Sequence, residues 1–364
     1  MLAALRPRFV IGLAGAGWSR FATLVDLSRI ATGRALGLFW LVLLTALASG
    51  GLTMHLLGPL PAPQADAHHH DSVPRVPAVR PQAGIASPIA ALQEPVPGQP
   101  GTFLPRITAD GQTPMRAYAA PFADHGGRPR IGLLVVGMGL NTADSEAAIR
   151  TLPAPVSLGF SPYADRPAPL LEAARAAGHE FLISLPLEPA GTPLHDAGDQ
   201  VLLPGASAEQ NARRLEWSLA RIGGYVGATG ALGALRGERF AEAGQPMREM
   251  LAALTARGLL YIDPRPNAAV ARPAIGRAVD LVIDSSAQAT MIDDSLYRLE
   301  QTAREHGSAL GLAGAPLPLT IGRLAAWAAG LEARGFVLTP VSALVVPPAP
   351  STAAGAPPPV EHRH

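Results

Sequence analysis

The stretch that decides the fold is IGLLVVGMGLN, residues 131–141. It starts as an uncharged apolar run and passes into a turn that contains two glycines, Gly137 and Gly139. A run of this kind is typical of a strand buried on both faces of a parallel sheet. Parallel sheets bind their ligands at the carboxyl ends of strands, so an end without a charged side chain predicts an unusual site.

Short apolar runs of this kind recur through residues 130–344. Seven further apolar runs occur, at 156–160, 180–184, 225–229, 259–262, 279–284, 308–313 and 336–340. Amphipathic segments between them, at 142–152, 166–178, 207–223, 245–258 and 289–307, are predicted helices. Apolar strands that alternate with helices predict an α/β fold with a parallel sheet, either a (β/α) barrel or an open doubly wound sheet.

Composition excludes some classes of partner. Hydrophobic residues make up 48% of the 364-residue chain, charged residues 16%, and the net charge is +1. Nucleic-acid binding needs clustered cations, so we expect no nucleic-acid partner. The chain has no cysteine, which is compatible with an oxidising compartment.

The N-terminal region predicts a membrane anchor. Residues 35–57 carry no acidic or basic side chain apart from His55, long enough for one helical span. Residues 1–34 hold five arginines and one aspartate, which places this basic segment in the cytoplasm. We therefore expect a single-pass inner-membrane protein with its C-terminal domain in the periplasm. A buried helix of a globular domain and a cleaved signal peptide stay open as alternatives.

Two flanking segments are rich in proline and alanine. Residues 58–128 are predicted to form a disordered linker and residues 346–364 a disordered tail. The linker contains three consecutive histidines, 68–70, followed by Asp71. In a linker we interpret them as a solvated polar run rather than as a metal site.

Common catalytic and nucleotide motifs are missing. The turn GMGLNT does not complete a dinucleotide fingerprint, because its third glycine would fall at Thr142. The chain contains no lysine for a phosphate loop and no G-x-S-x-G turn for a serine hydrolase.

The predicted strand ends carry a recognisable order of loops: SLPLEP (184–189), GATGALGALRGERF (227–240), DPRP (263–266), DSS (284–286) and AGAPLPLT (313–320). Together with PAPVSLGFSPYA, AARAAGHEFLISLPLEP, RGLLYIDPR and GFVLTPVSAL, this order resembles the divergent polysaccharide deacetylases of bacterial envelopes. The resemblance covers residues 130–344. It implies a distorted (β/α) barrel at 129–345 and a metal-dependent hydrolase ancestry.

The chain departs from that family at the positions where the resemblance implies metal-binding or basic residues. The strand-end pair of aspartates is replaced by Val136 and Gly137, and three histidine positions are replaced by Ser184, Ala231 and Ala315. Valine, glycine and alanine side chains offer no ligand atom to a divalent metal. We therefore expect no metal and no other cofactor at this face.

Four polar residues at the predicted strand ends are the main candidates for function: Asp263, Arg265, Asp284 and Glu188. Asp263 and Arg265 match the D-S-R pattern of the family and either pair with each other or bind a sugar. Asp284 either caps a loop or serves the site. Glu188 either lines a groove or has a structural role.

Other residues carry weaker hypotheses. His195, Asp196 and Asp199 form a possible relocated metal set in a long loop. Asp293 and Asp294 are interpreted as acids that open a helix, where they favour the helix dipole. His179 and His306 are predicted C-terminal caps of helices, and Trp217 and Trp327 are predicted core residues.

These observations leave three hypotheses for function. The first is a catalytically degenerate deacetylase-like protein that binds an envelope glycan, such as peptidoglycan or another polysaccharide, or a periplasmic protein. The second is an active hydrolase with a relocated site that uses His195, Asp196 and Asp263. The third is a structural envelope scaffold held at the inner membrane.

Overall fold

A computed structural model describes residues 40–41, 43–45, 84–123, 126–191, 195–269 and 274–345. From Gly84 onward, the described residues belong to one compact unit. The predicted cytoplasmic segment 1–34, the histidines 68–70 and the tail 346–364 lie outside the described residues. Most of the predicted anchor at 35–57 does too, and no helix among the described residues is long and apolar enough to cross a bilayer.

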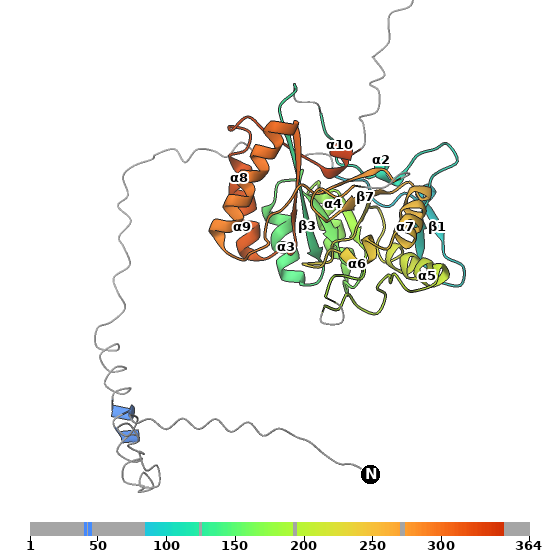
Figure 1. Ribbon diagram of the computed structural model, residues 1–364, viewed down its shortest axis with the longest axis horizontal. Coiled ribbons are helices and arrows are strands. Elements are labelled where there is room, and N and C mark those ends of the chain that lie inside the picture. The colour runs from blue at the N-terminus through green and yellow to red at the C-terminus, as the bar shows by residue number, and fades with distance from the viewer. Residues whose placement is uncertain are drawn as a thin grey trace, which may run out of the picture. The chain divides into compact units, whose positions relative to one another are not determined.

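The centre of the unit is a parallel sheet (Figure 1). Its strands follow the order β8 (Gly276–Ala278), β7 (Leu260–Asp263), β6 (Gly227–Thr229), β5 (Phe181–Ser184), β4 (Ser157–Phe160), β3 (Arg130–Met138), β10 (Ser308–Ala313) and β9 (Leu281–Val282). Strand β11 (Val337–Thr339) pairs with the first residues of β3. Each predicted apolar run contributes a strand at nearly its predicted position.

One continuous segment of the chain joins the two edges of the sheet, because the edge strands β8 and β9 follow each other in sequence. The Val279 amide donates to the Asp263 carbonyl of β7 at 3.0 Å, whereas the Asp280 amide donates to the Leu310 carbonyl of β10 at 2.8 Å. Run 279–284, predicted as one strand, is thus only partly strand, and the preceding β8 was not predicted. The sheet is a curled parallel half-barrel, which confirms the α/β class and excludes a flat, open sheet.

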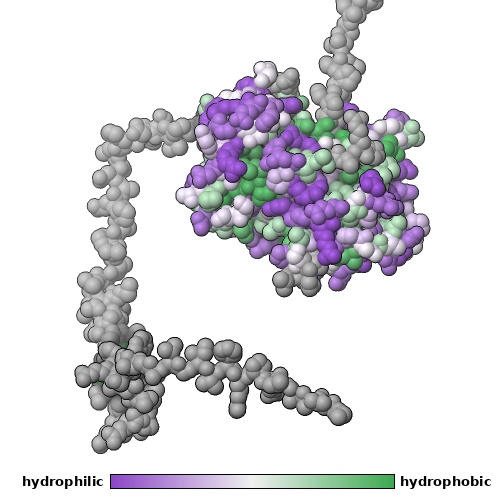
Figure 2. All heavy atoms as spheres, viewed as in Figure 1, coloured by the Kyte–Doolittle hydropathy of each residue, from purple (hydrophilic) through white to green (hydrophobic). Residues whose placement is uncertain are grey.

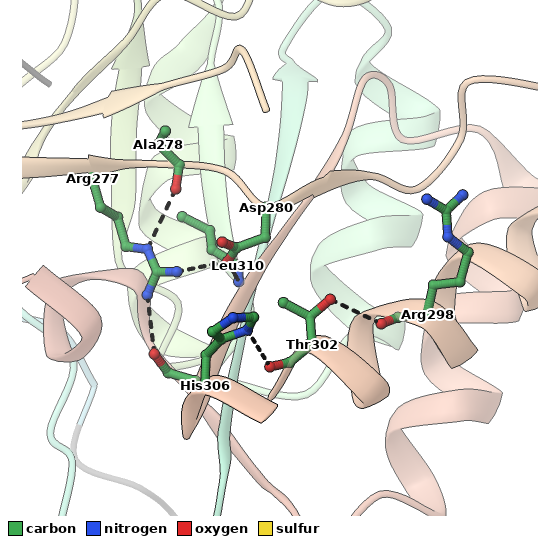
Figure 3. A network of polar contacts seen from close by, with 8 residues as sticks. Arg277, Ala278, Asp280, Arg298, Thr302, His306 and Leu310 are labelled. Carbon is green, nitrogen blue, oxygen red and sulfur yellow. Dashed lines mark hydrogen bonds and ion pairs between the residues drawn. The ribbon is translucent and has the colours of Figure 1, made fainter. Parts of the chain in front are cut away.

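A polar network reinforces this closure (Figure 3). The Asp280 carboxylate accepts hydrogen bonds from Arg277 Nη2 and from the Leu310 amide, both at 2.6 Å. Arg277 also reaches Ser308 Oγ at 3.3 Å. The side chains therefore connect the segment that bridges the sheet edges to the start of β10.

Helices flank the sheet on both sides (Figure 1). Helices α3 (Thr142–Thr151), α8 (Ala289–His306) and α9 (Pro318–Ala329) pack together on one side, and α5 (Ala208–Leu219) packs against α7 (Gln245–Ala256) on the other. The described helices also include α4 (Pro167–Ala176), α6 (Glu238–Ala241) and α10 (Val341–Val345). Ser207 and Gln210 form a capping box that fixes the start of α5. The five predicted helices are confirmed; α9 was not predicted.

The prediction of a linker over 58–128 is wrong from Gly84 onward. This part contains η2 (Ala90–Leu92), the hairpin β1 (Gln93–Pro95) and β2 (Phe103–Pro105), and α2 (Pro114–Ala117). Its scattered apolar side chains pack with inward-facing residues of the strands in one cluster; those of the segment are Ile85, Leu92, Met115, Tyr118 and Ala120. A segment with few apolar residues among many prolines therefore looks like a linker in the sequence, although its side chains pack against the inner face of the half-barrel.

A buried carboxylate holds three distant parts of the chain together. Glu180, which precedes β5 and is fully buried, accepts hydrogen bonds from the Ala120 amide at 3.0 Å and from Ser157 Oγ at 2.8 Å. It also accepts from the Ser342 amide at 2.9 Å and from Ser342 Oγ at 2.5 Å. Four donors compensate for the loss of water around the charge.

We predict that Glu180→Gln lowers the free energy of unfolding by about 2–3 kcal/mol, because one amide NH2 then faces hydrogen-bond donors in a dry site. Chemical denaturation followed by circular dichroism measures the change. The matched control is Glu305→Gln at an exposed position of α8, which we expect to change stability by less than about 0.5 kcal/mol. Equal stability of the two variants would contradict the role given to Glu180.

Candidate functional site

The carboxyl ends of β3, β5, β6 and β10 are the place where this fold would hold a ligand. They lie on the α6 side of the sheet in Figure 1, whereas α2 and α10 lie at the opposite end. Val136 of β3 and Ala231, just after β6, are both completely buried. They belong to the same apolar cluster as the inward-facing side chains of the half-barrel. Two positions that the resemblance assigns to the metal site are thus core residues.

Glycines from three strand-end loops pack backbone against backbone beside Val136. Gly137 has a φ of +77°, and a Cβ atom there would lie 3.3 Å from the Gly314 carbonyl oxygen. A Cβ on Gly314 would lie 3.1 Å from the Gly233 carbonyl oxygen. A larger side chain at Gly137 would be strained by its left-handed backbone and crowded by the β10 loop.

The remaining polar atoms at this position do not form a metal site. Ser184 Oγ is buried and has no hydrogen-bond partner among the described residues. Beside it, the Tyr261 hydroxyl and Leu187 occupy the space next to Gly230, where an added Cβ would lie 2.8 Å from either side chain. No group of three histidine, aspartate or glutamate side chains that could hold a metal occurs in the described part of the chain. The donor set does not fit the metal that the fold family implies.

Asp263 and Arg265 pair with each other. Asp263 at the end of β7 is 1% exposed. Its Oδ1 accepts from the Arg265 amide and from Arg265 Nε, both at 3.0 Å, and its Oδ2 accepts from Arg265 Nη2 at 2.8 Å. The hydrogen bond to Asp263 raises the pKa of Arg265 above its ordinary value. This geometry supports the structural alternative, in which the pair fixes the β7 loop.

Asp284 also ties loops together. Its two carboxylate oxygens accept from the Gly314 amide at 2.8 and 3.0 Å, which fixes the β10 loop against the end of the β9 segment. Burial lowers the pKa of the nearby Arg236 guanidinium, and the charges of Asp284 and Glu238 offset this effect only in part. No sequence pattern singles out Arg236.

Glu188 borders an open polar groove beside the closed strand ends. Its side chain is 11% exposed and forms an ion pair with Arg239 Nε at 3.6 Å. The groove has a volume of about 470 Å³ and is lined by Glu188, Leu203, Pro204, Gly205, Ala206, Gln210, Arg214 and Arg239. Glu188 thus borders this groove and at the same time pairs with Arg239, so both of its alternatives stay open. The two arginines were missed, because arginine on a helix is common and periodicity alone does not show what it faces.

The possible relocated metal set is not assembled. His195 Nδ1 lies 2.9 Å from the Ala190 carbonyl, and Asp196 Oδ1 accepts from the Gly198 amide at 2.8 Å. Each side chain thus stabilises its own loop, while Asp263 is occupied by Arg265. Asp199 acts at longer range. Burial is the largest cause of the raised pKa of Tyr163, and the negative charge of Asp199 raises it further.

Two further predictions need correction. Asp293 does not open α8, which begins at Ala289; it pairs instead with Arg323 of α9, with Oδ1 2.7 Å from Nε. Asp294 is not in the first turn either. Trp217 is not a core residue but is partly buried against Tyr163, with ring centroids 5.4 Å apart. Trp327 is also only partly buried, although it does pack on the core.

The two predicted histidine caps both occur at helix ends. The Gly178 and His179 amides donate to the Arg175 and Ala174 carbonyls, which closes the end of α4. The ring of His179 is completely buried, and this burial lowers its pKa despite nearby carbonyl oxygens. In the last turn of α8, His306 Nδ1 lies 3.1 Å from the Thr302 carbonyl (Figure 3).

Comparison with known proteins identifies the family. Residues 133–345 match the family model described as divergent polysaccharide deacetylase. The chain belongs to the divergent polysaccharide deacetylase family. An uncharacterised protein of Agrobacterium tumefaciens with a crystal structure is 33% identical, with a TM-score of 0.62 over 66% of this chain and 99% of that chain.

A more distant similarity is to the catalytic domain of a peptidoglycan N-acetylglucosamine deacetylase from Eubacterium rectale, at 13% identity and a TM-score of 0.39. It spans 61% of this divergent polysaccharide deacetylase and 93% of that chain. No curated protein matches the sequence significantly.

We predict that Arg265→Ala lowers the free energy of unfolding by about 3 kcal/mol, because it leaves the Asp263 carboxylate buried without its partner. The double variant Asp263→Leu/Arg265→Met removes both charges and should recover most of that loss. Urea denaturation of the wild-type chain, of Arg265→Ala and of the double variant measures the free energy of unfolding of each. A double variant less stable than Arg265→Ala would show that the pair does more than neutralise a buried charge.

Proposed function

We propose that this divergent polysaccharide deacetylase is a non-catalytic protein that binds an envelope glycan. In this proposal, residues 35–57 anchor the chain in the inner membrane and the domain faces the periplasm. The uncharged length of 35–57 and the arginines before it support the anchor. The family model supports a carbohydrate as the ligand class.

The observation that carries the proposal is the packed core at the strand ends where the resemblance implies a metal site. Val136 and Ala231 lie inside the apolar interior, and Gly137, Gly233 and Gly314 bring three loops into backbone contact. Deacetylation of the family's type needs a polarising metal and a base at these strand ends. The described residues there provide neither, while the frame of strands around them is intact.

The experiment uses the full chain, purified in detergent, in two assays. Co-sedimentation with insoluble peptidoglycan tests glycan binding, and acetate release from an acetylated chitooligosaccharide in the presence of zinc tests catalysis. We expect co-sedimentation and no acetate above the protein-free blank. Acetate release would contradict the non-catalytic assignment. Failure to sediment, together with stable co-purification of envelope proteins, would favour a scaffold instead.

A further inference from the structure

One flank of α5 presents a row of polar and aromatic side chains. Gln210, Arg214, Trp217 and Arg221 follow at spacings of four, three and four residues, which places them on the same side of the helix and of the turn that follows it. The buried residues of α5, such as Leu215 and Leu219, lie on a different side. This row is not required to build the core.

The first half of the row borders the groove next to Glu188. Gln210 and Arg214 line it with Arg239, so the groove, with a volume of about 470 Å³, holds two guanidinium groups and one carboxylate. Arg239 already pairs with Glu188, whereas no ion pair joins Arg214 to Glu188 among the described residues. The Nη1 atom of Arg214 is buried and has no hydrogen-bond partner among the described residues. A buried N–H of a charged group that lacks an acceptor is costly. Arg214 as a whole is only partly buried and lines the groove, so a small rotation of its guanidinium toward an anionic ligand there would relieve this cost.

The second half of the row is an aromatic surface. The Trp217 ring lies 5.4 Å from the Tyr163 ring at an angle of 44°, and the Arg221 guanidinium carbon lies 5.3 Å from the centre of the Trp217 ring. Both rings are partly exposed. The flat, apolar face of a pyranose ring stacks on side chains of this kind.

A single loop joins the two halves. The Gln200 amide donates to the Tyr163 hydroxyl at 3.2 Å, and two residues later the Leu202 carbonyl accepts from the Glu188 amide at 3.0 Å. The groove and the aromatic pair are thus neighbouring parts of one surface. Figure 2 shows strongly hydrophilic residues around α6, which carries Arg239.

We infer that this surface, composed of Glu188, Arg214, Trp217, Arg221, Arg239 and Tyr163, binds a saccharide that carries a carboxylate. The carboxylate lies at Arg214 and Arg239, because the groove that they line holds two arginines against one glutamate, Glu188, and because a guanidinium matches carboxylate geometry. The charges of Asp196 and Asp199 act on Tyr163, in the aromatic half of the surface. A neighbouring sugar ring stacks on Trp217. This inference rests on the proposed glycan-binding function and places the ligand beside the closed strand ends.

The test compares two disaccharide probes on the full chain. N-acetylglucosaminyl-N-acetylmuramic acid carries a carboxylate, and di-N-acetylchitobiose has the same type of backbone without one. We expect the acidic probe to bind at least about tenfold more tightly by isothermal titration calorimetry, because it adds a hydrogen bond between charged groups. Arg214→Gln and Arg239→Gln should each abolish the preference for the acidic probe. Trp217→Ala should weaken the binding of both probes.

Arg213→Gln is the matched control, because it removes an exposed arginine from the same helix on a different side; it should keep the preference. Equal binding of the two probes, or an unchanged preference in Arg214→Gln and Arg239→Gln, would overturn the inference. If the wild-type chain then still sediments with peptidoglycan, only the placement of the site is wrong. If it binds no glycan at all, the proposed function fails with it.

Discussion

The burial of strand β3 among its paired strands is the constraint on which the rest of the structure depends. The strand pairs with β10 along its first six residues, with β11 at its start and with β4 toward its end. All residues from Ile131 to Met138 are therefore buried. A charge on such a strand would need a partner or a metal to compensate for its lost hydration. With Val136 and Gly137 at its end, β3 needs neither.

The same constraint explains how the strand ends pack without charged side chains. Apolar and small side chains at the strand ends extend the packed interior, and glycines allow the β3, β6 and β10 loops to approach each other closely. Two polar residues at the strand ends connect neighbouring groups: Asp263 pairs with Arg265, and Asp284 accepts a hydrogen bond from the Gly314 amide. Binding, in our proposal, has moved outward to a surface that depends on arginine and tryptophan instead of metal.

The sequence predicted the strands well because each is a short apolar run between helical segments. It failed for 84–120, where the contribution of single residues such as Leu92 and Tyr118 depends on distant partners. Trp217 occupies an apolar-looking helical position, but only the fold shows that it meets Tyr163. Similarly, helical spacing places Arg214 and Arg213 on different sides of α5, but only the fold shows that Arg214 lines a groove.

The most direct test of the central claim is the zinc content of the chain after incubation with excess zinc and gel filtration. Inductively coupled plasma mass spectrometry should be applied to a variant in which His68, His69 and His70 are replaced by alanine, so that this histidine run cannot contribute. The account predicts that the variant retains far less than one zinc ion per chain. Retention of about one tightly held zinc ion per chain would contradict it, because a metal site would then persist in the folded domain.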